Sequence, residues 1–207
     1  MRKIIVLSFL SLDGVIQAPG GPEEDTDGDF KYGGWSFGPN DDLVGKEMVN
    51  QMSHDFDLLL GRRTYGIFAS YWPFVDTNNN PIAAGINKAR KYVVSKTLDD
   101  NFTWPKSFLI KDNVVEEIKK LKAAEGPEIQ VHVSGNMIQT LLKNDLVDEF
   151  WLKIYPITLG TGKKLFADGS IAKSFELLEC KTTPKGIILA KYKKDGDIKT
   201  GSFTEKK

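Results

Sequence analysis

The sequence predicts an α/β fold in which helices cover both faces of a mixed central sheet. Two observations support this. Short apolar runs without polar alternation recur along the chain, as is typical of strands buried on both faces. Helical patterns lie between these runs, and alternation of strand and helix is the signature of the α/β class. The 207 residues suit one domain, predicted over residues 1–207.

The predicted elements follow from hydrophobic spacing and turn signals. The buried strands are residues 4–10, 58–60, 92–94 and 129–133. The predicted helices are residues 43–56, 64–72, 82–91, 114–124 and 136–143. Residues 148–155 alternate like a half-exposed strand, with Trp151 and Tyr155 on the outer face. Residues 175–179 and 186–193 flank a turn containing Pro184 and Gly186, which predicts a C-terminal antiparallel hairpin.

Charge and composition exclude several classes of protein. The chain has 28 basic and 28 acidic residues, so it lacks the basic surface that nucleic-acid binding requires. One cysteine, Cys180, cannot form an internal disulfide, and His54 and His132 are too few for most zinc sites, so we expect no metal. No stretch approaches the length of a membrane helix, and residues 4–12 are interpreted as a buried strand rather than a signal peptide. We expect a cytoplasmic protein that binds no membrane.

The segment 17–42 is unusually long for a loop inside a domain, and such loops are usually functional. Its run of acidic residues between 23 and 29 is interpreted as a mobile surface excursion. Trp35 and Phe37 need an apolar partner, which is either the core or a ligand, and both alternatives remain open.

Three predicted strand-to-helix junctions carry residues suited to phosphate binding. Glycine lets backbone approach a phosphate, a helix N-terminus offers free N–H groups, and arginine supplies a planar fork of donors. Each junction could instead be an ordinary solvated cap, but three in one sheet indicate an extended phosphorylated ligand such as a dinucleotide. The residues are Gly61, Arg62, Arg63 and Thr64; Ser95, Lys96 and Thr97; and Ser134, Gly135 and Asn136.

Five motifs in this order resemble the dihydrofolate reductase superfamily. The similarity is greatest to the branch containing the reductase domain of the bifunctional riboflavin-biosynthesis deaminase-reductase, and it extends from Lys3 to about Tyr192. The motifs are Ser11-Leu-Asp13-Gly14, Leu60-Gly61-Arg62-Arg63-Thr64-Tyr65, Tyr92-Val-Val-Ser95-Lys96-Thr97, Asp145-Leu-Val-Asp148-Glu149, and Pro156-x-x-Leu159-Gly160-x-Gly162-x-x-Leu165-Phe166.

The resemblance implies a three-layer α/β/α fold with an eight-stranded mixed sheet, and hydride transfer from NADPH to a pyrimidine- or pteridine-like substrate. The nearest named activity is 5-amino-6-(5-phosphoribosylamino)uracil reductase. By position, residues 61–65 would bind the adenosine-side phosphates, residues 95–97 the 2′-phosphate region, and residues 135–138 the pyrophosphate, which adds Met137 and Ile138 to the cofactor residues. Asn136 departs from the Gly-Gly pair that dihydrofolate reductases carry there.

The resemblance places a proton-donating acid near the start of the helix that follows the long loop. Asp41 or Asp42 could serve, but both also make ordinary helix caps, which is the interpretation favoured for Asp41. Asp13 is the other candidate, although it could simply form a turn. Trp72, together with the two loop aromatics named above, is assigned to the substrate side. Related reductases commonly pair, so we expect a homodimer acting on a small molecule. The alternatives are a reductase for folate or another small heterocycle, and a non-catalytic NADP-binding protein.

Overall fold

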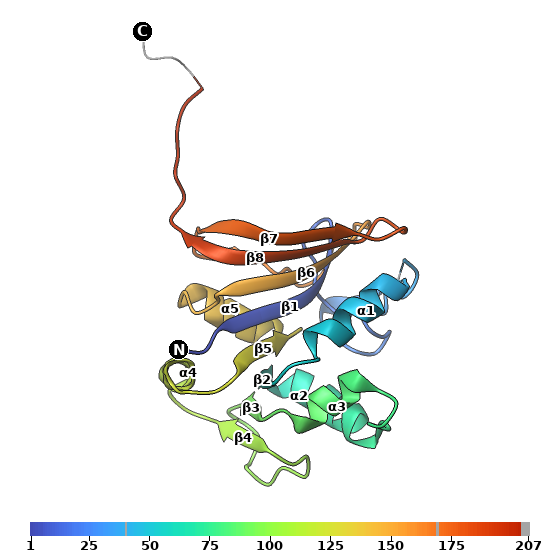
Figure 1. Ribbon diagram of the computed structural model, residues 1–207, viewed down its shortest axis with the longest axis vertical. Coiled ribbons are helices and arrows are strands. Elements are labelled where there is room, and N and C mark those ends of the chain that lie inside the picture. The colour runs from blue at the N-terminus through green and yellow to red at the C-terminus, as the bar shows by residue number, and fades with distance from the viewer. Residues whose placement is uncertain (40, 169, 204–207) are drawn as a thin grey trace.

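In the computed structural model, which describes residues 1–39, 41–168 and 170–203, eight strands form one sheet (Figure 1). The strand order is β4-β3-β2-β5-β1-β6-β8-β7. The pairs from β4 to β6 are parallel, whereas β8 lies antiparallel to both β6 and β7. The predicted mixed sheet with a C-terminal hairpin is therefore confirmed. The bounds are β1 Ile4–Ser11, β2 Phe56–Gly61, β3 Lys91–Val94, β4 Ser107–Ile110, β5 Glu128–His132, β6 Glu149–Tyr155, β7 Ser174–Thr182 and β8 Ile188–Gly196.

Helices cover both faces of this sheet. Helices α4 and α5 pack on one face over the largest hydrophobic cluster, while α1, α2 and α3 cover the other face over two smaller clusters (Figure 1). None of the helices among the described residues combines the length and apolar character needed to cross a bilayer. The bounds are α1 Asp42–Gln51, α2 Arg62–Tyr71, α3 Pro81–Lys88, α4 Val114–Ala123 and α5 Gly135–Lys143, with short 3₁₀ helices η1 Asp27–Asp29 and η2 Trp72–Phe74.

The structure corrects two predicted helices and adds one strand. The helix predicted over residues 82–91 ends at Lys88, and Lys91 already begins β3. The first helix is shorter than residues 43–56, because Met52 leaves helical geometry and Phe56 already begins β2. Both of these side chains are buried, so apolar spacing alone continues the helix too far. The edge strand β4 was not predicted. It is a four-residue edge strand whose short apolar run, Phe108–Ile110, leaves Phe108 48% exposed.

Strand β6 is also more deeply buried than the sequence indicates. Its side chains alternate as predicted, but β6 lies between β1 and β8, and Tyr155 is 0% exposed. The Tyr155 ring packs at 5.4 Å from Trp35 and 5.8 Å from Phe9, measured between ring centroids. The prediction that Tyr155 lies on an exposed face is therefore wrong, although Trp151 remains half-buried.

Candidate cofactor site

A single pocket of about 500 Å³ lies where the carboxyl ends of β2, β3 and β5 meet the following segments. It brings together every predicted cofactor residue except Ile138, which lies on the buried side of α5 in the hydrophobic core. Parallel strands of an open α/β sheet bind ligands at this edge. The lining residues are Asp25, Asp27, Gly61, Arg62, Arg63, Thr64, Val94, Ser95, Lys96, Thr97, Val114, Val133, Ser134, Gly135, Asn136, Met137, Thr140 and Lys163.

Two helices begin at this pocket without a side-chain cap. Gly61 is the N-cap of α2 in an extended conformation, and Ser134 precedes α5, but neither supplies a capping hydrogen bond from its side chain. The first N–H groups of such helices lack intrahelical partners and carry a partial positive charge. Arg62 and Lys96 add two cations, and neither forms an ion pair with any residue in the part of the chain that the structure describes. The pocket is therefore suited to several anionic groups.

The junction between β5 and α5 has a constrained backbone. Val133 has a φ of 37°, a left-handed conformation that is costly for a β-branched residue. Gly135 does not need its glycine for internal packing, because an added Cβ would meet only Ile16, at 3.9 Å. The space that Gly135 leaves open thus belongs to the pocket.

In the junction after β3, one residue stabilises the turn and two others face the pocket. The Ser95 hydroxyl accepts hydrogen bonds from the backbone N–H groups of Thr97 at 3.1 Å and Leu98 at 3.0 Å, and its side chain is buried. Ser95 therefore shapes the turn, whereas Lys96 and Thr97 are exposed at the pocket. Residue type alone could not separate these roles.

Three charged residues of the pocket were missed by the sequence reasoning: Asp25, Asp27 and Lys163. The two aspartates were interpreted as part of a surface excursion, but each forms ion pairs with both Arg63 and Lys163. Arg63 is consequently already occupied by carboxylates. The position of Lys163 beside Gly160 and Gly162 is the signal that could have located it. Nothing local in the sequence connects Lys163 with Asp25, which lies 138 positions earlier.

The pocket continues into a narrow extension of about 30 Å³ that the long loop largely fills. Ile16 and Ile67 form apolar walls there, next to Gly135. Glu24 from the loop also lines this extension, where burial raises the pKa of its carboxyl group. Its carboxylate accepts a hydrogen bond from the backbone N–H of Gly20 at 2.6 Å.

The two candidate proton donors have different environments. Asp13 accepts hydrogen bonds from the Ser11 hydroxyl at 2.6 Å and from the backbone N–H groups of Gly160 at 2.7 Å and Leu159 at 3.1 Å. These bonds, that from Ser11 foremost, lower the pKa of Asp13 to about 2. Asp13 is therefore ionised at neutral pH and anchors the loop after β6, which does not fit a proton donor.

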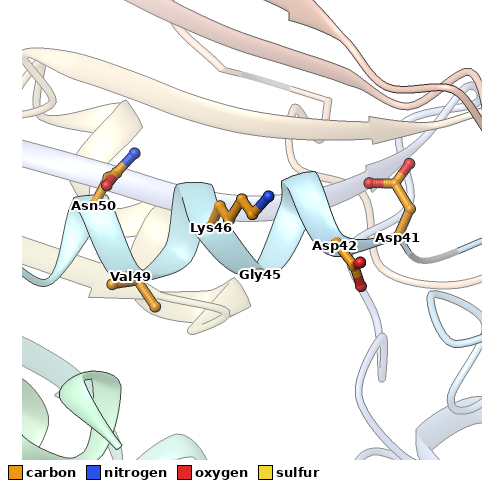
Figure 2. A pocket seen from close by; sticks show the side chains of 6 residues that line it. All are labelled: Asp41, Asp42, Gly45, Lys46, Val49 and Asn50. Carbon is orange, nitrogen blue, oxygen red and sulfur yellow. The ribbon is translucent and has the colours of Figure 1, made fainter.

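Asp42 instead lies in the first turn of α1 and is exposed. Figure 2 shows Asp41 and Asp42 at the start of the helix, with Lys46 extending toward this end. The Asp41 carboxylate accepts a hydrogen bond from the backbone N–H of Leu43 at 2.9 Å, which confirms its capping role. The hollow beside this helix has a volume of about 550 Å³. The catalytic role of Asp42 stays a prediction.

The aromatic residues assigned to the substrate also differ from one another. Trp35 is 9% exposed and donates its indole N–H to the backbone oxygen of Gln17 at 2.7 Å, so it belongs to the core. Phe37 is 86% exposed. Trp72 is half-buried, with its ring 6.1 Å from that of Phe68. Substrate contact remains a prediction for Phe37 and Trp72.

Comparison with known proteins agrees with this geometry. The chain is 28% identical over 202 residues to the uncharacterized protein YyaP of Bacillus subtilis (strain 168), covering 94% of this chain and 96% of that protein. The fold is similar to that of a protein named for riboflavin biosynthesis from Shewanella sp. PV-4, with a TM-score of 0.64, 24% identity, and coverage of 94% of this chain and 99% of that one. It is also similar to a pyrimidine reductase-like protein from Corynebacterium diphtheriae, with a TM-score of 0.66, 14% identity, and coverage of 95% and 93%. The family model described as the RibD C-terminal domain matches residues 2–189, and the chain belongs to this family.

Proposed function

We propose that this protein is an NADPH-dependent reductase that transfers hydride to a pyrimidine- or pteridine-like substrate. The nearest named activity is 5-amino-6-(5-phosphoribosylamino)uracil reductase. One observation carries the proposal: two uncapped helix N-termini and two unpaired cations, Arg62 and Lys96, line one pocket at the carboxyl edge of a parallel sheet. A dinucleotide offers anionic groups with this spread. Membership of the RibD C-terminal domain family supports a reductase.

The residues present fit NADPH by the chemistry of their donors. Arg62 and Lys96 would bind the 2′-phosphate, and the N–H groups at the starts of α2 and α5 would bind the pyrophosphate. Bound NADPH supplies the hydride. Ile16 and Ile67 provide an apolar wall that excludes water from the extension of the pocket. Reduction of a carbon–nitrogen double bond also needs one proton, for which Asp42 is the candidate donor.

The experiment follows the absorbance of NADPH with a panel of pyrimidine and pteridine substrates. Turnover with the phosphoribosylamino-uracil compound is expected. Turnover only with dihydrofolate would favour the folate alternative. NADPH binding without oxidation of any substrate would favour a non-catalytic protein and would overturn the proposal.

We also propose that the protein assembles as a homodimer. The contact would use the side of β6 that carries Trp151, a large ring that remains half-buried. The Lys191 ammonium lies 5.0 Å from the centroid of this ring, so Trp151 offers less free surface than its place on the predicted outer face suggests. Sedimentation at micromolar concentration is expected to give twice the 23.1 kDa chain mass. A single species at the chain mass would contradict the dimer.

A further inference from the structure

Four charged side chains close one part of the cofactor pocket. The Arg63 guanidinium lies 2.7 Å from Asp27, and the Lys163 ammonium lies 2.6 Å from Asp25 and 2.7 Å from Asp27. Arg63 also contacts Asp25. All four residues line the pocket, so two carboxylates occupy donors that face the ligand space.

The two cations come from different walls of the pocket. Arg63 belongs to the first turn of α2. Lys163 lies in the segment after β6, where its backbone oxygen accepts a hydrogen bond from the N–H of Ile16 at 2.9 Å. The preceding Gly162 has a φ of 111°, and an added Cβ would lie 2.8 Å from atoms of Phe30 and Val15, so only glycine fits. This backbone fixes where Lys163 is presented, and the carboxylates bridge the two walls.

The acidic segment is held in place mainly by polar contacts. The Gln17 amide donates hydrogen bonds to the backbone oxygens of Asp25 at 3.1 Å and Asp27 at 2.9 Å, and its oxygen accepts one from the N–H of Lys163 at 3.0 Å. None of the residues of η1 is buried. No residue from Asp25 to Asp29 is buried, although Phe30 next to them is, so loss of the ion pairs would free this stretch at little cost in buried surface.

We propose that Asp25 and Asp27 form a carboxylate latch, which holds the phosphate-binding position between Arg63 and Lys163 until a diphosphate group of the nucleotide displaces it. This inference rests on the proposed function, because the nucleotide is the ligand of the same pocket. Carboxylate and phosphate oxygens compete for the same N–H donors, and a diphosphate offers more of them. The nucleotide must supply the free energy that opens the latch, and this requirement lowers its apparent affinity.

A different role for the same cluster would be a permanent wall that keeps Arg63 in position. The two roles predict opposite changes in ligand affinity when the carboxylate charges are removed. A latch competes with the ligand, so removal of its charges tightens binding. A permanent wall supports the ligand site, so removal of its charges weakens binding or leaves it unchanged.

The test compares the wild type with the double variant Asp25→Asn/Asp27→Asn by calorimetry, using NADPH and inorganic pyrophosphate as separate ligands. We expect the double variant to bind both ligands about tenfold or more tightly, because charge-assisted hydrogen bonds no longer compete with them. The control is Asp29→Asn, which removes one carboxylate charge, half the change in the double variant, from an exposed residue of the same segment outside the cluster. Its affinity is expected to stay within about twofold of the wild type, since Asp29 is exposed, does not line the pocket and forms no ion pair among the described residues.

Hydrogen exchange on the wild type adds a measurement that depends on no variant. A latch predicts faster amide exchange in residues 20–30 when pyrophosphate is bound, whereas a permanent wall predicts slower exchange. Equal or weaker binding by the folded double variant, or slower exchange, would overturn the latch. If the latch is overturned in this way but the wild type still oxidises NADPH with a substrate, the proposed function stands. Tighter pyrophosphate binding without any NADPH binding would retain the latch and reject the proposed function.

Discussion

The hydroxyl groups of Ser134 and Thr64 lie 3.0 Å apart, and this contact joins the two helix N-termini of the pocket. Ser134 precedes α5, and Thr64 lies in the first turn of α2. The Ser134 oxygen also accepts a hydrogen bond from the backbone N–H of Gly61 at 3.2 Å. Both side chains are buried, so the relative position of the two helix starts depends on these bonds.

Ser134→Ala is expected to lower the free energy of unfolding by about 1–3 kcal/mol, because Gly61 N–H and the Thr64 hydroxyl lose a buried partner. NADPH affinity should fall as well. Urea unfolding and calorimetry measure the two effects. In a double-mutant cycle with Thr64→Val, the destabilisations should not add, since the two side chains share one interaction. Additive effects would show that the hydroxyls act independently.

The sequence predicted most of the sheet and the three junctions that meet at the pocket because their signals are local. A buried strand that ends at Gly61, followed by arginine and threonine, indicates both the fold and the chemistry. The same holds for Gly135. Strand β4 was missed because it is a short edge strand in which only Ile110 is buried.

Other features depend on contacts between distant parts of the chain. Asp25 meets Lys163 across 138 positions, and no local pattern pairs them. Tyr155 is buried because β8 follows β6 in the sheet and because Trp35 packs on its ring, neither of which alternation can reveal. Cys180 is exposed because β7 is an edge strand, which the sequence of the strand alone does not reveal.

Gly135→Val is expected to fold with nearly wild-type stability but to lose NADPH binding. An added Cβ meets the protein only at ordinary van der Waals distance, 3.9 Å from Ile16, whereas the remaining atoms of valine would enter the pocket. Thermal unfolding and calorimetry separate the two effects. Gly45→Val on α1, where an added Cβ meets nothing within 4 Å, is the matched control outside this pocket. Wild-type NADPH affinity in folded Gly135→Val would show that the junction is only structural.

Arg62→Ala is expected to weaken NADPH binding about tenfold or more while leaving NADH binding nearly unchanged. The reason is that Arg62 is unpaired at the pocket, and a charged hydrogen bond contributes about 1.5–3 kcal/mol. Calorimetry with both nucleotides gives the ratio of dissociation constants. Arg90→Ala removes an exposed arginine that does not line the pocket and should change neither affinity. Equal losses for NADPH and NADH would mean that Arg62 does not contact the 2′-phosphate.

Asp13→Asn is expected to destabilise the protein at neutral pH and progressively less in acid. The Ser11 hydroxyl and the N–H groups of Gly160 and Leu159 lower the pKa of Asp13 to about 2, below the value of about 3.9 in an unfolded chain. A carboxylate with a lowered pKa stabilises the fold fully above the unfolded pKa, and this contribution disappears as the pH falls through the folded pKa. The wild type and the variant should therefore differ most in unfolding free energy above about pH 4 and converge toward pH 2. Urea unfolding across this range provides the measurement, with Asp29→Asn as an exposed control of equal charge change. A difference that grows as the pH falls would contradict the anchoring role of Asp13.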